Sequence, residues 1–181
     1  MILSVSYGRA WHYAQSWDEM SRLVAEVLAG LEPEGRAGEW YSPGEDAWFC
    51  LAEQRLDDGN PVGDNYLRVA VNRSTGYGAL VWGVTEDSPR RGGIFDSVWV
   101  SDNPQPPDFD PRVVADPGAP SFHDPRSALP TPQVRAAVEE FCRTGTGDRP
   151  ECVRWVEGHM NGQRLDREPV TGFVENTDPF A

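Results

Sequence analysis

The sequence predicts an α+β fold in one domain, residues 1–181, with a mainly antiparallel sheet of about five to seven strands and two amphipathic helices on one face. Alternating apolar and polar residues recur in runs of strand length, and two other segments repeat apolar residues at helical spacing. Turn-forming residues separate neighbouring strand-like runs by distances that suit antiparallel pairs. The two apolar helix faces need a common sheet face to bury against.

The N-terminal region predicts a strand followed by the clearest helix of the chain. Ile2–Tyr7 alternates as a strand does, and Trp11 and Tyr13 continue the alternation. Ser16 and Glu19 form a capping box, in which each side chain accepts from a backbone N–H of the other residue. Behind it runs one continuous apolar face, made of Met20, Leu23, Val24, Val27, Leu28 and Leu31. A stripe of this kind indicates core packing.

Three further strands follow in the middle of the chain. We expect a loop from Gly35 to Gly44 and a strand over Ala47–Ala52. Tyr66–Val71 and Tyr77–Val84 read as two strands joined by a five-residue turn, which favours a hairpin. Ile94–Val100 predicts another strand, with Trp99 near its end.

Residues 101–130 interrupt this pattern. They hold eight of the 16 prolines of the chain. Proline cannot donate to a sheet ladder, so we expect an irregular surface segment here. The segment is also rich in aspartate, and a loop of this length inside a compact domain is usually functional or partly disordered.

Ser127–Glu157 predicts a second unit of helix, tight turn and strand. Thr131 is a natural N-cap and Pro132 suits the first helical position. Val134, Ala137, Val138 and Phe141 make an apolar stripe, Gly145 and Gly147 end the helix, and Cys152–Val156 alternates as a strand.

This unit resembles the Imm-one family of immunity proteins. The resemblance lies in a Pro before a capped helix, then V-R-x-A-V-x-E-F, T-G, R-P and V-x-W, and it extends more loosely to Leu67–Val84. It implies a bacterial antidote that binds and neutralises a cognate toxin domain, often of the deaminase fold, by occluding its active site or substrate groove. Neither catalysis nor a cofactor is required of such a protein.

The net charge of −13 bears on the partner, and all 16 basic residues are Arg. A protein that binds nucleic acid needs cations to neutralise phosphates, so the charge argues against that class. It favours a basic protein partner through complementary fields, although solubility alone also explains an acidic surface. No apolar run approaches the length of a membrane span and no leader pattern is present, so we expect a cytoplasmic protein.

Catalytic and metal-binding patterns are largely missing. His12, His123 and His159 are far apart, without HxH or HExxH spacing, and the three cysteines lack CxxC spacing. There is no GxSxG motif. We therefore assign no catalytic residue, no metal ligand and no cofactor. His159, flanked by Gly158 and Gly162, is the one histidine that a small hydrolase could use.

The residues that we expect to contact the partner lie in or beside the proline-rich segment. Aspartates there can occupy a basic groove in place of phosphates, and a Trp beside them can act as an anchor. The predicted contact residues are Asp102, Asp108, Asp110, Asp116 and Asp124, with Trp99. Two alternatives remain: an acidic adaptor or regulatory domain that binds another basic protein, and a small hydrolase.

Overall fold

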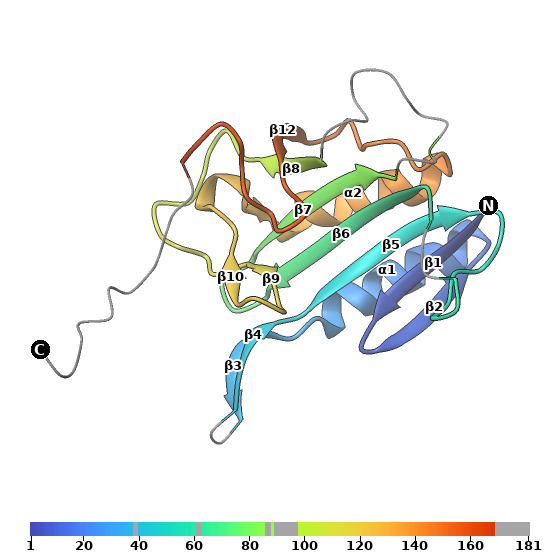
Figure 1. The fold of residues 1–181 in the computed structure, drawn as a ribbon, viewed down its shortest axis with the longest axis horizontal. Coiled ribbons are helices and arrows are strands. Elements are labelled where there is room, and N and C mark those ends of the chain that lie inside the picture. Colours follow the sequence, from blue (N-terminus) through green and yellow to red (C-terminus); the bar gives the residue numbers. More distant parts are fainter. Residues whose placement is uncertain (38–39, 61–62, 86–87, 89–97, 169–181) are drawn as a thin grey trace, which may run out of the picture.

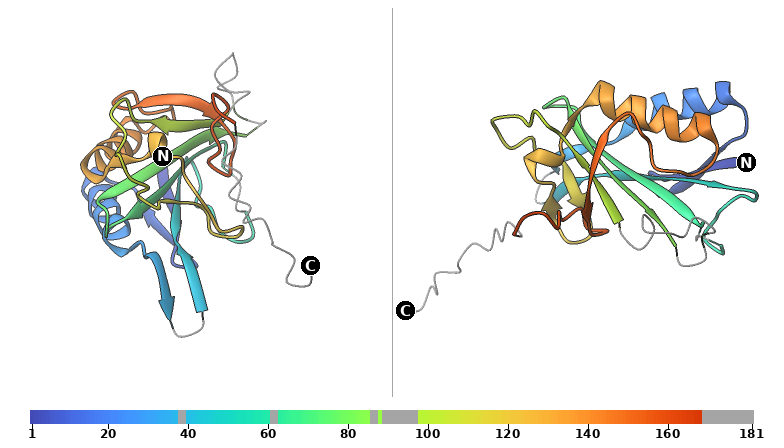
Figure 2. Two further views of the ribbon diagram at one scale, coloured as in Figure 1. Left: turned by 90° about the vertical axis from the view of Figure 1, so that its left-hand side faces the viewer. Right: turned by 90° about the horizontal axis from the view of Figure 1, so that it is seen from above.

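A computed structural model of the chain describes residues 1–37, 40–60, 63–85, 88 and 98–168. Within these residues, one antiparallel sheet carries two helices on a single face, which confirms the predicted α+β fold (Figures 1 and 2). Its seven-strand path runs β12 (Arg154–Gly158), β8 (Val98–Asp102), β7 (Tyr77–Val84), β6 (Asn65–Asn72), β5 (Asp46–Ala52), β1 (Ile2–Tyr7) and β2 (Ala10–Ala14). A two-residue strand, β11 (Leu129–Pro130), pairs with the start of β7.

Helix α1 (Trp17–Gly30) begins as the sequence predicts. Ser16 Oγ accepts from the Glu19 N–H over 3.3 Å, and Glu19 Oε2 accepts from the Ser16 N–H over 3.1 Å. Helix α2 (Thr131–Thr144) begins one residue earlier than predicted. Thr131 is its first helical residue and Pro130 its N-cap, so the predicted Thr131 cap is wrong. Gly145 ends α2 in the left-handed conformation, with a φ of 66°.

The main core lies between the two helices and the sheet. The apolar stripes of α1 and α2 pack against alternate residues of the central strands, among which Phe49, Leu67 and Trp82 are fully buried. Trp82 Nε1 donates to the Gly147 carbonyl over 3.1 Å, so the turn after α2 is fastened to β7. A buried indole N–H needs such an acceptor.

Residues 103–128, between β8 and β11, form a layer on the opposite face of the sheet. They contain β9 (Val114–Asp116), β10 (Ser121–Phe122) and the short 3₁₀ helix η1 (Pro125–Ser127). The segment buries a small apolar cluster against β6 and β7, made of Ala70, Ala79, Val113, Val114 and Ala128. Arg68 donates to the Ala115 carbonyl, and Asn72 Nδ2 donates to the Pro111 carbonyl over 3.0 Å. Polar side chains of β6 thus supply some of the hydrogen bonds that hold this proline-rich layer, and Ser101 of β8 adds one to the Ser127 carbonyl over 2.7 Å.

Strands β3 (Pro33–Ala37) and β4 (Trp40–Gly44) pair as a hairpin arm that projects from the body of the fold (Figure 1). The prediction of a loop from Gly35 to Gly44 is therefore wrong. The arm escapes sequence reasoning because it buries no continuous face and so carries no period-two apolar pattern.

Two strand boundaries also differ from the expected ones. β8 begins at Val98, and residues 94–97 of the predicted strand lie outside the described residues. β12 begins at Arg154, two residues after the predicted start at Cys152. In the part of the chain that the structure describes, no helix has the length and apolarity needed to cross a membrane.

Candidate functional site

The five predicted aspartates fall into two groups with different surroundings. Asp102 and Asp124 are partly buried and bonded to arginines, whereas Asp108 and Asp110 are exposed. Asp116 lies between these cases: its Oδ1 accepts from the backbone N–H groups of Gly118 and Ala119, over 2.8 and 3.2 Å.

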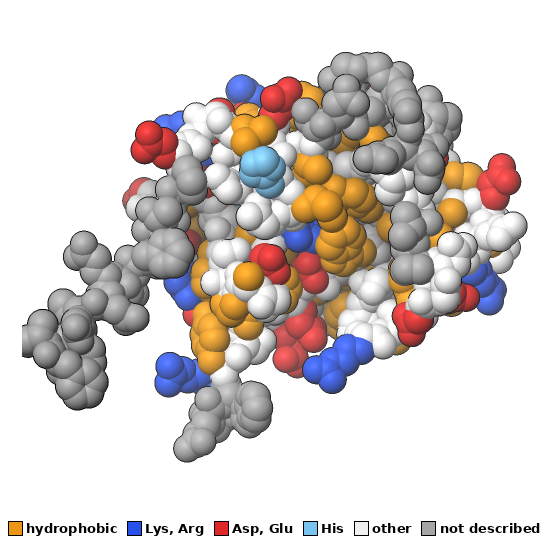
Figure 3. Space-filling view, viewed as in Figure 1, with side chains coloured by type: hydrophobic (Ala, Val, Ile, Leu, Met, Phe, Trp, Pro, Cys, Tyr) orange, Lys and Arg blue, Asp and Glu red, His pale blue; other side chains and the backbone are white. Residues whose placement is uncertain are grey.

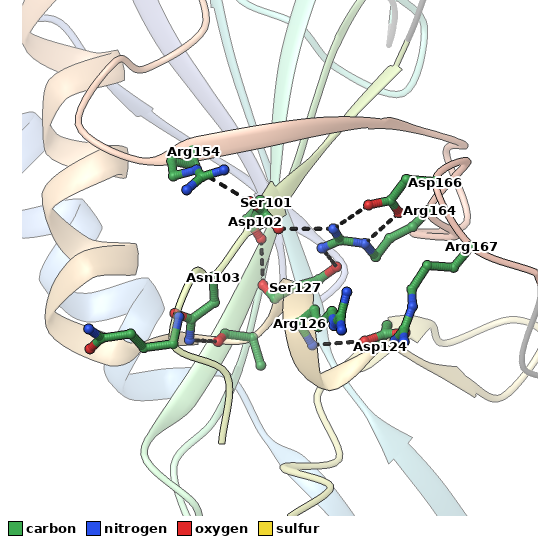
Figure 4. Close-up of polar contacts among 12 residues, drawn as sticks. Ser101, Asp102, Asn103, Asp124, Arg126, Ser127, Arg154, Arg164, Asp166 and Arg167 are labelled. Carbon is green, nitrogen blue, oxygen red and sulfur yellow. Dashed lines mark hydrogen bonds and ion pairs between the residues drawn. The ribbon is translucent and has the colours of Figure 1, made fainter. Parts of the chain in front are cut away.

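Asp102 is the centre of an ion-pair network at the end of β8 (Figure 4). Its side chain is 13% exposed and accepts from Arg164 Nη2 over 2.9 Å, and Arg154 of the neighbouring strand lies 3.4 Å away. Arg164 is 3% exposed and also bonds Asp166, through Nε and Nη2 over 2.9 and 2.8 Å. Hydrogen bonding to Arg164 holds the pKa of Asp166 below its usual value.

Asp124, like Asp102, binds an arginine of the segment after β12. Its Oδ1 accepts from the Arg126 N–H over 2.8 Å and so caps η1, and its Oδ2 accepts from Arg167 Nη1 over 3.1 Å (Figure 4). Both aspartates therefore attach the segment that follows β12 to the rest of the fold. A carboxylate already bonded to an arginine contributes little free charge to a partner.

Asp108 and Asp110 lie in the exposed loop between β8 and β9. Phe109, between them, is 47% exposed, and its ring meets Tyr77 edge-on with centroids 5.7 Å apart. Asp110 Oδ1 accepts from the Arg112 N–H over 2.9 Å. This bond supports a backbone φ of 50° at Arg112, a conformation that is uncommon for a residue other than Gly.

The arm joins this loop through Arg112. The Arg112 guanidinium pairs with Glu34 of β3, and Arg112 Nε lies 2.6 Å from Glu34 Oε2. The same guanidinium lies 3.8 Å from the ring centroid of Phe122. The Tyr41 hydroxyl donates to Glu34 Oε1 over 2.6 Å, and the Tyr41 side chain is 42% exposed. Hydrogen bonding to Arg112 lowers the pKa of Glu34, which keeps this carboxylate ionised.

We call the surface made of Glu34, Tyr41, Asp108, Phe109 and Asp110 the acidic face. It combines the exposed carboxylates of Asp108 and Asp110 with two exposed aromatic rings, the composition of a protein-binding surface that recognises a basic partner. Glu34, whose carboxylate is paired with Arg112, holds Tyr41 in this surface. Sequence reasoning found its two aspartates but missed Phe109 and Glu34. Phe109 carried a signal, since it is an aromatic residue between two acids in a proline-rich loop. Figure 3 views the molecule from the side of the sheet that lies away from the helices.

Trp99 does not lie with these residues. It packs against the core on the helix-bearing side of the sheet, and the Arg149 guanidinium is 4.0 Å from its ring centroid. Residues 99 and 102 of one strand point to opposite faces, because side chains alternate along a strand. The structure therefore does not bring Trp99 together with Asp102.

A cavity of about 560 Å³ lies beside the acidic face, between the loop before η1 and the segment after β12. Its wall includes Asp110, Arg112 and His123. His123 is buried, and burial, with the nearby Arg68 charge, lowers the pKa of its imidazole to about 3. This histidine is therefore neutral at physiological pH.

The described residues contain no group of three His, Cys, Asp or Glu side chains that could hold a metal ion. Cys50 and Cys142 are buried, which raises the pKa of each thiol to about 12, far from that of a reactive thiolate. His159 is exposed, in a turn closed by a hydrogen bond from its N–H to the Gln163 carbonyl over 2.8 Å.

A family model described as Immunity protein Imm1 matches residues 9–157, most of the chain. The chain belongs to the Imm1 immunity protein family. Membership supports a toxin-neutralising immunity function, and it implies a cognate toxin as the partner of this Imm1 protein. No curated protein and no solved structure matches the chain. The matched span contains the whole acidic face and both helices, but it ends before Arg164 and Arg167.

Proposed function

We propose that this Imm1 protein binds a nucleic-acid-acting toxin domain of the deaminase fold and covers its basic substrate groove with the acidic face. The observation that carries the proposal is the family match over residues 9–157. It makes a toxin the partner, and the remaining question is which surface of the immunity protein binds it.

The charge supports the acidic face as that surface. A domain that acts on nucleic acid needs a cationic groove, and this chain has a net charge of −13. Asp108 and Asp110 present carboxylates at the surface, where they can replace phosphates, and Phe109 and Tyr41 add apolar contact area. The inhibitor acts by binding alone, in the cytoplasm, and needs no cofactor.

The first experiment is co-expression of the chain with the C-terminal toxin domain encoded by the adjacent upstream gene. We expect a one-to-one complex that co-purifies, growth rescue, and loss of nucleic-acid binding by the complexed toxin. The same complex should form with His159→Ala, because a binding protein does not need this histidine. Absence of both a complex and rescue would favour the alternative, an acidic adaptor for another basic protein.

Competition with nucleic acid separates two modes of inhibition. If the acidic face fills the groove, a labelled oligonucleotide should be displaced from the toxin as the immunity protein is added. A complex that still binds the oligonucleotide would show that the immunity protein covers a surface next to the groove, and the proposed occlusion would be wrong.

A further inference from the structure

A second cavity lies away from the acidic face, where the turn after α2 meets the start of β12. Its volume is about 550 Å³. Four apolar side chains line it together with Arg149, namely Trp82, Pro150, Val153 and Trp155. Trp155 Nε1 donates to the Pro150 carbonyl over 2.7 Å and Trp82 Nε1 to the Gly147 carbonyl over 3.1 Å, so both rings are held in place.

Arg149 differs from the other enclosed arginines that the structure describes. Arg68 pairs with Asp46 at 3.7 Å, and Arg164 pairs with Asp102 and Asp166. Arg149 forms no ion pair with any carboxylate among the described residues, and its Nη1 is buried without a hydrogen-bond partner. Burial lowers the pKa of Arg149.

Aromatic stacking holds the guanidinium in place. It lies 4.0 Å from the ring centroid of Trp99 and 6.0 Å from that of Trp82. Stacking on a ring face is favourable for a guanidinium and leaves its in-plane N–H groups to other acceptors, and Nη1 of Arg149 has none. A guanidinium fixed in this way is prepared to receive a planar group with two acceptor oxygens.

We propose that Arg149, stacked on Trp99, receives an Asp or Glu side chain of the toxin domain. The inference rests on the proposed function and adds a second contact region to it. Trp and Arg are the residues most often found at the energetic centre of protein interfaces, especially where water is excluded. Arg149 lines the cavity, so a carboxylate that enters it meets a guanidinium without an ion pair among the described residues.

The surroundings of Arg149 favour a single carboxylate over a polyphosphate. Two cations line the cavity, and Arg154 is already within ion-pair distance of Asp102. Arg149 therefore supplies the one unpaired positive charge among the described lining residues. One such charge matches the single negative charge of a carboxylate better than the several charges of a polyphosphate.

The test compares Arg149→Met with wild type in binding to the co-purified toxin domain, measured by isothermal titration calorimetry or surface plasmon resonance. The Met side chain keeps an unbranched apolar chain against Trp99 but lacks the guanidinium group. We expect at least a tenfold loss of affinity, with an unchanged or higher melting temperature, because the unsatisfied donor is gone. Arg135→Met is the matched control: Arg135 is exposed on α2 and pairs with Glu139, and its loss should leave affinity unchanged.

Alanine substitution of each toxin Asp and Glu then identifies the partner residue. One of these changes should show an effect that is not additive with Arg149→Met in a double-mutant cycle. If Arg149→Met fails to fold, Arg149→Lys takes its place, since it keeps the charge but lacks the bidentate geometry and should lose the same coupling. Wild-type affinity for these variants, or no coupled toxin carboxylate, would overturn the inference. Failure of the wild-type protein to bind the toxin would instead overturn the proposed function.

Discussion

Arg164 and Asp102 form a buried ion pair that joins the segment after β12 to the end of β8. Arg164 Nη2 lies 2.9 Å from Asp102 Oδ1, and both side chains are largely removed from solvent. Asp102 thus acts inside the fold. Ser101 Oγ next to it donates to the Ser127 carbonyl over 2.7 Å, so the same strand end also holds η1.

This pairing predicts a large effect of Arg164→Ala on stability. Breaking one partner of a buried pair leaves an uncompensated charge, and we expect the free energy of unfolding to fall by about 3 kcal/mol in urea titrations. Arg154→Ala removes a partner of the same aspartate, but the Arg154 side chain is 70% exposed. It should cost at most about 1 kcal/mol. Equal losses for the two variants would contradict the structural role of Arg164.

The elements with a strong period were predictable from the sequence, and those without one were not. Helix α1 and the hairpin of β6 and β7 bury continuous faces, so their apolar spacing identified them. The arm of β3 and β4 buries no such face and was expected to be a loop. Its position depends on Arg112, a residue 78 positions away from Glu34 in sequence, and no local pattern reports such a contact.

The candidate site was predictable in composition but not in arrangement. Its acidic residues were visible in the sequence, yet the partners of Asp102 and Asp124 lie 62 and 43 residues further along the chain. Sequence spacing could not separate these bonded aspartates from the exposed Asp108 and Asp110. Sequence position also led to the prediction that Trp99 lies with the aspartates. In the structure, the Arg149 guanidinium stacks on the Trp99 ring instead.

Gly162 is a second position where the segment after β12 depends on close packing. Its φ is +79°, and a Cβ added there would lie 2.5 Å from Cε1 of the buried His123. We expect Gly162→Ala to destabilise the protein by about 2 kcal/mol or more, since conformational strain and overlap add. Gly76 has nearly the same φ, +77°, with no atom within 4 Å of an added Cβ. Gly76→Ala should therefore lower the free energy of unfolding only by the cost of the backbone conformation, about 1 kcal/mol. Thermal denaturation of both variants and of wild type measures the difference.

Glu140 should make stability depend on pH. Burial opposes its ionisation, but hydrogen bonds from the Cys152 side chain and from the N–H groups of Glu151 and Cys152 outweigh burial and lower its pKa. A carboxylate with a depressed folded pKa adds stability above its unfolded pKa, near 4.5, and loses it as pH falls through the folded pKa.

The variant Glu140→Gln tests this dependence. Wild type should be more stable than the variant at pH 7, and the difference should shrink as pH falls below about 4.5. Urea titrations at a series of pH values measure it. Glu139→Gln is the control on the same helix, because Glu139 pairs with an exposed arginine on the helix surface. A difference between wild type and Glu140→Gln that is constant from pH 7 to pH 3 would show that the backbone hydrogen bonds do not depend on the charge of Glu140.

Reversing charge on the acidic face should slow association with the toxin. We expect Asp108→Lys combined with Asp110→Lys to reduce the association rate by about tenfold or more at low salt, because complementary fields accelerate encounter. The reduction should diminish as added salt screens exposed charges. Both residues are exposed, so the melting temperature should change little apart from the loss of the Asp110 bond to the Arg112 N–H.

A second double variant controls for net charge in that experiment. Glu26→Lys with Glu53→Lys changes the charge by the same amount at exposed positions on α1 and after β5. It should retain most of the wild-type association rate, because only local carboxylates steer the basic groove onto the acidic face. If both double variants slow association equally, the toxin responds to overall charge and the acidic face is not its docking surface. If neither does, the contact lies elsewhere on the protein.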